Sequence, residues 1–180
     1  MKSKTVFFHV SFSASDLLDS ETRFDDITGE LINIGIEFDN WFHDEVIGCV
    51  GCTFITEKLY YMFKDFGEHL TGINFAKPIR FNKGYNAMEN YPDANIPCFY
   101  YMNMTGKLLV DDFSIFRLNG SYNCVLSDTA VKFLLNNGVY SAFGEMINNE
   151  IHEYFEIYYQ KIKKNNYSEV MPRLFLKDFI

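Results

Sequence analysis

The sequence contains no long apolar run: no stretch approaches the roughly 18 residues that a membrane-spanning helix requires. It also has no G-x-x-x-x-G-K-S/T or G-x-G-x-x-G phosphate loop, no G-x-S-x-G serine motif and no H-E-x-x-H zinc motif. The basic start is followed by an apolar run that is too short for a signal peptide and is broken by His9. We therefore expect a cytoplasmic protein that enters no membrane and uses none of these catalytic motifs.

Cysteine is scarce, and only one spacing suggests chemistry. Cys49 and Cys52 form a C-x-x-C pair close to His43 and Asp44. A small enzyme that uses this region for metal or thiol chemistry is our alternative hypothesis. However, no second close pair completes a zinc site, and the pair precedes an apolar run instead of a helix N-terminus. We therefore expect buried or half-buried cysteines, no metal, no cofactor and no enzymatic activity.

Basic residues are outnumbered, 16 against 24 acidic ones, and the formal net charge is −8. Residues 11–50 carry ten acidic side chains and one arginine, a net charge of −9, so the other 140 residues sum to +1. A segment of one charge repels nucleic acid and needs either solvation or a basic partner. Two interpretations stay open: a solvated acidic surface, or a docking face for a basic protein. We expect no binding to nucleic acid, which depends on phosphate neutralisation.

Two large apolar residues, Trp41 and Phe42, lie inside the acidic segment. Apolar anchors within a charged rim are typical of the centres of protein interfaces, although a core tryptophan at a strand end would give the same pattern. The predicted partner-binding residues are Asp16, Asp19, Glu21, Asp25, Asp26, Glu30, Trp41, Phe42, Asp44 and Glu45.

Residues 123–139, "NCVLSDTAVKFLLNNGV", predict a strand, a cap, a helix and a stop. A short apolar run ends at Ser127, whose hydroxyl can accept an N–H from the first helical turn, and Asp128 suits the positive end of the helix dipole. The helix is expected over residues 128–137, before Gly138. A nucleophilic role for Ser127 is the alternative, but capping explains the residue without further assumptions. As a cap, aspartate should serve at position 127 about as well as serine.

An earlier segment, "CTFITEKLYYMFKDFG", repeats this pattern. Thr56 stands where Ser127 stands and Gly67 stands where Gly138 stands, both at an offset of 71 residues. Side-chain identity between the two copies is nearly nil. A duplicated element and the general pattern of a strand followed by a three-turn helix are therefore both open.

We expect one domain over residues 1–180, because 48% hydrophobic and 18% aromatic residues are enough for a sizeable core. Pro78 suits an edge strand, and the loop-rich residues 82–97 form an excursion. The fold class is α+β, with a mixed, mostly antiparallel sheet, the two strand-cap-helix units and a longer C-terminal helix. Beyond the two units, strands are expected over 5–12, 30–39, 70–81, 98–104 and 107–118, the last with a break at Asp111-Asp112, and the long helix over 147–162.

Three stretches, "LTGINFAKPI", "DDFSIFRLN" and "CVLSDTAVKFLLNNG", resemble bacterial immunity proteins encoded beside polymorphic toxins. The matching positions are Asp112, the Ser127-Asp128 pair and the segment from Gly72 to Ile79, within a resemblance that covers residues 70–145. It implies a binding module that neutralises a cognate toxin domain, with no catalytic residue of its own. The toxin domain is expected to be basic, and a nuclease is one kind of toxin that fits.

Overall fold

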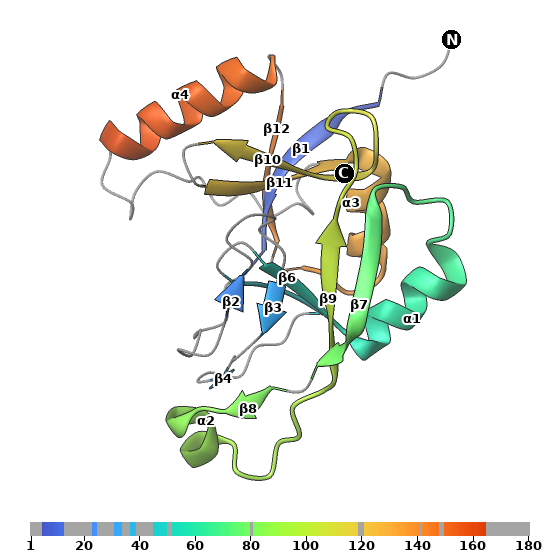
Figure 1. Ribbon diagram of the computed structural model, residues 1–180, viewed down its shortest axis with the longest axis vertical. Coiled ribbons are helices and arrows are strands. Elements are labelled where there is room, and N and C mark those ends of the chain that lie inside the picture. The colour runs from blue at the N-terminus through green and yellow to red at the C-terminus, as the bar shows by residue number, and fades with distance from the viewer. Residues whose placement is uncertain are drawn as a thin grey trace.

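The computed structural model describes residues 5–12, 23–24, 31–33, 37–38, 45–49, 52–79, 81–118, 121–140, 142–147 and 150–164 (Figure 1). Helices and mostly antiparallel strands form an α+β arrangement, which confirms the predicted fold class. The described strands are divided between two four-stranded sheets and two short strand pairs, a division that the sequence did not predict.

The first sheet is built around the hairpin of β5 (Val46–Cys49) and β6 (Cys52–Thr56). Next to β6 lies β9 (Phe99–Met104), and β7 (Ile73–Ile79) completes the order β5-β6-β9-β7. All three pairings are antiparallel. The prediction of an edge strand at Pro78 is confirmed, since β7 is an edge and its register shifts between Phe75 and Pro78.

The second sheet is built around the hairpin of β10 (Phe113–Leu118) and β11 (Ser121–Ser127). Its inner neighbour is β1 (Phe7–Ser11), from the start of the chain, and β12 (Phe143–Met146) completes the order β10-β11-β1-β12. These pairings are also antiparallel. The first strand of the chain therefore lies between two strands that follow it by more than a hundred residues.

The two sheets belong to two equivalent units. In each, a hairpin runs directly into a helix, α1 (Glu57–Phe66) or α3 (Asp128–Asn136), and the strand after the helix is an edge strand. The remaining inner strand is β9 in the first unit and β1 in the second. The likeness of the two strand-cap-helix segments thus extends to whole units of four strands and one helix.

A single core lies between the units, because α1 and α3 are on the same side of the sheets (Figure 1). The rings of Phe63 and Phe133 join the two helices, with centroids 4.6 Å apart. Leu59 and Leu134 are fully buried beside them. Both sheets contribute inner-face residues to this core: Phe8, Val10, Val46, Ile55, Tyr100, Met102, Phe113 and Leu126.

The longer helix, α4 (Ile151–Lys164), covers the other face of the second sheet (Figure 1). It begins four residues later than predicted and ends close to the predicted point. Phe155 stacks on Phe116, with ring centroids 4.6 Å apart. Lysines in the last turn suit the negative end of the helix dipole, as the sequence indicated.

Two short strand pairs involve the acidic N-terminal segment. One is β2 (Arg23–Phe24) with β3 (Leu31–Asn33), antiparallel. The other is β4 (Glu37–Phe38) with β8 (Asn82–Lys83), parallel. Of the strand predicted over residues 30–39, the structure describes β3 and β4 only. Beside β4, a second buried cluster covers the outer face of the first sheet: Phe38, Ile47, Cys52, Phe54, Phe81 and Phe99.

Two predicted segments differ from the structure. The strand expected over residues 107–118 is present only after the predicted break at Asp111-Asp112, from Phe113. Before the break, residues 108–110 form a turn in which the Asp111 carboxylate accepts the N–H of Lys107 at 2.5 Å. The excursion at residues 82–97 holds β8 and a short helix, α2 (Tyr85–Asn90), where the sequence predicted only loop. Local asparagine and glycine content concealed this helix.

Leu134→Ala should lower the free energy of unfolding by about 2 to 5 kcal/mol, because it opens a cavity in the core shared by both units. Leu135, half-buried on the same helix, provides the control: Leu135→Ala should cost clearly less. Denaturant melts of the two variants test this, and equal losses would contradict the described orientation of α3.

His9 is buried under α4, against the rings of Tyr154, Phe155 and Tyr158. The Tyr154 hydroxyl donates to Glu145 Oε2 at 3.1 Å and lies 3.2 Å from His9 Nδ1. Because that hydroxyl has one hydrogen, Nδ1 must be the N–H that donates to it. Burial lowers the pKa of His9 from 6.5 to about 4.

This shift predicts acid destabilisation. Between pH 6.5 and 4 the unfolded chain binds a proton that native His9 does not, so stability should fall by about 3 kcal/mol as the pH falls through this range. Unfolding midpoints measured across the range test this. His9→Gln should flatten the slope, whereas His152→Gln, at an exposed position of α4, should leave it unchanged. Equal slopes in the wild type and His9→Gln would contradict the assignment.

Candidate functional site

The start of α3 is organised by one buried hydroxyl. Ser127 Oγ accepts the N–H of Ala130 at 3.1 Å, which confirms the predicted cap. The same hydroxyl donates to Asp112 Oδ1 at 2.5 Å. Ser127 is only 1% exposed, and both hydrogen bonds are internal. The arrangement supports capping and offers no open approach to a nucleophile.

Asp112 connects this cap to the first unit. Its other carboxylate oxygen accepts the N–H of Thr71 at 3.0 Å and the Thr71 hydroxyl at 3.2 Å, and that hydroxyl accepts the N–H of Asp112 at 3.1 Å. Backbone bonds follow the same path: the N–H of Ser127 donates to Asp112, and the N–H of Phe113 donates to Thr71. We call Thr71, Asp112 and Ser127 the junction.

Gly72 allows the two units to approach at the junction. Its φ is +78°, a left-handed conformation that glycine adopts without strain. A Cβ atom here would collide with the carbonyl oxygen of Phe113, and so would one at Gly106. The three separate positions of the family resemblance, Gly72, Asp112 and Ser127, therefore meet in one place, and their role there is structural.

The same device begins α1. Thr56 Oγ1 accepts the N–H of Leu59 at 3.3 Å and donates to the carboxylate of Glu45. The N–H of Thr56 donates to the carbonyl of Glu45 at 3.0 Å, as Ser127 does with Asp112. Lys58 Nζ also lies 2.5 Å from Glu45 Oε1. Each unit thus begins its helix at a hydroxyl held by a carboxylate from the residue directly before the first strand of its hairpin.

Glu45 is the one predicted partner-binding residue that the structure describes. Its carboxylate is engaged by Thr56 and Lys58, so a variant at this position would disturb the start of α1. The other nine lie outside the described residues, and their role in binding stays a prediction: Asp16, Asp19, Glu21, Asp25, Asp26, Glu30, Trp41, Phe42 and Asp44.

The C-x-x-C pair lies across the β5-β6 hairpin, where Cys49 and Cys52 are register partners. Cys52 is buried in the cluster with Phe54 and Phe99, which agrees with the expectation of a core cysteine. The side chain of Cys49, and residues His43 and Asp44, lie outside the described part of the chain. Cys124 contacts Thr53 at 4.0 Å, and burial raises the pKa of its thiol to about 11.

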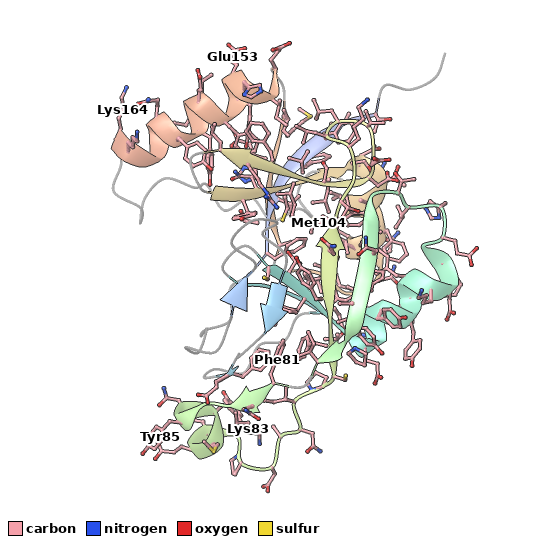
Figure 2. All side chains as sticks on the ribbon, in the orientation of Figure 1. Phe81, Lys83, Tyr85, Met104, Glu153 and Lys164 are labelled. Carbon is pink, nitrogen blue, oxygen red and sulfur yellow. The ribbon has the colours of Figure 1, made fainter. Side chains whose placement is uncertain are left out.

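The excursion at residues 82–97, which we call the arm, carries apolar side chains that sequence reasoning missed. Tyr85 is 69% exposed and Met88 is 54% exposed, one helical turn apart on α2. Figure 2 shows Tyr85 at the outer end of the arm and Phe81 at its root. The sequence does indicate this surface, because it places large apolar residues in a segment whose other residues are typical of a polar loop.

The arm is hydrogen-bonded to the acidic segment. β8 pairs with β4, and the N–H of Gly84 donates to the carbonyl of Phe38 at 2.6 Å. Phe38 packs against Phe81, with ring centroids 5.3 Å apart. These contacts therefore hold the arm, with its exposed apolar side chains, against β4 of the acidic segment.

Comparisons with models of protein families, with curated proteins and with solved structures find no match to this chain. The resemblance to toxin immunity proteins stays a prediction that depends on the motif residues described above. Among the described residues, no helix has the length and apolar character needed to cross a membrane. In that same part of the chain, no three His, Cys, Asp or Glu side chains are placed to hold a metal ion.

Ser127→Ala should lower the free energy of unfolding by about 2 kcal/mol, because it removes the cap and a donor to Asp112. The structure corrects the expectation that aspartate would serve as well: Ser127→Asp would place two carboxylates in contact in a buried position. This variant should be the more destabilised of the two.

A double variant separates charge repulsion from crowding. Ser127→Asp combined with Asp112→Asn should recover part of the loss, because the asparagine amide can donate to the new carboxylate. Denaturant melts of the single and double variants measure the coupling. A double variant no more stable than Ser127→Asp alone would contradict the proposed repulsion.

Proposed function

We propose that this chain is a cytosolic immunity protein that binds and neutralises a basic toxin domain through an acidic surface. The observation that carries the proposal is the charge distribution, −9 in residues 11–50 and +1 in the remainder. Localised charge of one sign steers an oppositely charged partner and accelerates association.

The bonds among the residues that carry the resemblance support a distinction between residues that build the fold and residues that bind the partner. Thr71, Asp112 and Ser127 bond to one another and to the start of α3. If the resemblance to immunity proteins holds, its common positions specify the scaffold, and toxin recognition belongs to other parts of the chain. The acidic segment is the strongest candidate, because its composition differs most from that of the remaining sequence.

Charge reversal tests the proposal. The variant Asp25→Lys/Asp26→Lys/Asp44→Lys changes three acidic positions and spares Glu45, whose carboxylate holds the start of α1. The probe is the C-terminal domain encoded by the gene immediately upstream. Association should be about tenfold slower at low salt, and its dependence on salt should weaken, because the variant loses the charge attraction that salt screens. Stopped-flow mixing at several salt concentrations provides the measurement.

The matched control changes the same net charge on α4. Glu153 and Glu156 on the helix and Glu150 directly before it are exposed, and their triple replacement by lysine should leave association within about twofold of the wild type. Co-expression supplies the functional test: cells that produce the upstream domain should survive when they also produce this chain. Equal rates for both triple variants would identify the acidic segment as a solvated surface, and cell death despite co-expression would refute neutralisation.

A further inference from the structure

The arm, with β8 and α2, lies at one end of the molecule, opposite α4 (Figure 1). Tyr85 and Met88 project from α2, and Tyr91, just after the helix, is 45% exposed. Tyrosine and methionine are enriched in protein interfaces, and tyrosine is common among the residues that contribute most binding energy. A cluster of this kind at the tip of a projecting segment has the composition of a contact surface.

Internal bonds hold the arm in one conformation. Lys83 Nζ donates to the carbonyl oxygens of Tyr91 at 2.8 Å and Pro92 at 2.7 Å, which closes the segment on itself. The Tyr85 hydroxyl donates to Glu89 at 2.6 Å, and Ala87 on the same helix is buried. A surface ordered before binding loses less conformational entropy when a partner docks.

The charge of the arm specifies the chemistry of its partner. Glu89 and Asp93 are exposed. Lys83 is half-buried, and its ammonium group donates to two carbonyl groups of the arm itself. The arm also joins the acidic segment through the pairing of β8 with β4. Its outer surface therefore combines apolar side chains with negative charge, a combination that complements a basic protein surface with apolar contacts.

We propose that the arm is a docking surface for the basic toxin domain, with Tyr85 and Met88 as its apolar anchors and Glu89 and Asp93 as its acidic rim. This inference rests on the proposed function and deepens it, since it assigns part of the contact to a segment outside the acidic residues 11–50. Anchor residues govern the dissociation rate, whereas rim charges chiefly govern association.

The test uses the full chain and the upstream-encoded C-terminal domain as probe. Tyr85→Ala/Met88→Ala should weaken the affinity for the probe at least tenfold, as measured by isothermal titration calorimetry. The loss should come chiefly from faster dissociation. Both side chains are exposed, so the thermal midpoint should stay within a few degrees of the wild type. The control is Tyr61→Ala/Phe66→Ala, which removes two aromatic side chains from α1 that are 52% and 65% exposed; its affinity should be unchanged.

The outcomes distinguish the two proposals. If the wild type binds the probe and the arm variant binds within twofold, the arm is not an interface and the proposed function stands. If the wild type does not bind the probe at all, the proposed function fails and the arm proposal fails with it. Sedimentation of the chain alone supplies a further outcome: a dimer that dissociates in Tyr85→Ala/Met88→Ala would show self-association through the arm and overturn the proposal.

Discussion

Each unit depends on a buried hydroxyl that serves two groups at once. It accepts an N–H from the first turn of the helix and donates to a carboxylate at the start of the hairpin, in the pairs Ser127 with Asp112 and Thr56 with Glu45. A hydrogen bond to an ionised group is stronger than a neutral one, and stronger still where water is excluded. These bonds determine the angle between the hairpin and the helix that follows it. They thereby determine which face of each helix packs against the common core.

The part of the fold that sequence reasoning predicted is local. Backbone chemistry that involves only near neighbours predicts the roles of Ser127, Thr56 and Pro78, and the structure confirms all three. The part that it missed depends on distant pairing. No local pattern connects Asp112 with Thr71, or shows that the first strand of the chain completes the second sheet.

The candidate site follows the same division. The excess of acidic residues is visible in composition. The bonds of Glu45 to Thr56 and Lys58 are not, because they require tertiary structure. The sequence predicts an excursion at the arm but not its order, because that order depends on bonds from Lys83 to carbonyl groups eight and nine residues away. The junction and the proposed binding surfaces thus lie in different segments, so the proposed surfaces could change while the junction is retained.

The position of β1 has a consequence for how the protein is made. A ribosome delivers the first unit, with β9, before any of the strands that β1 pairs with have been synthesised. β1 carries buried residues such as Phe8 and Val10, and these must wait for β11 and β12. Pairing across such a separation in sequence is slow, and an unpaired apolar strand is prone to aggregation meanwhile. During this interval β1 of the nascent chain is unpaired, and we expect it to bind the chaperones that act on chains at the ribosome.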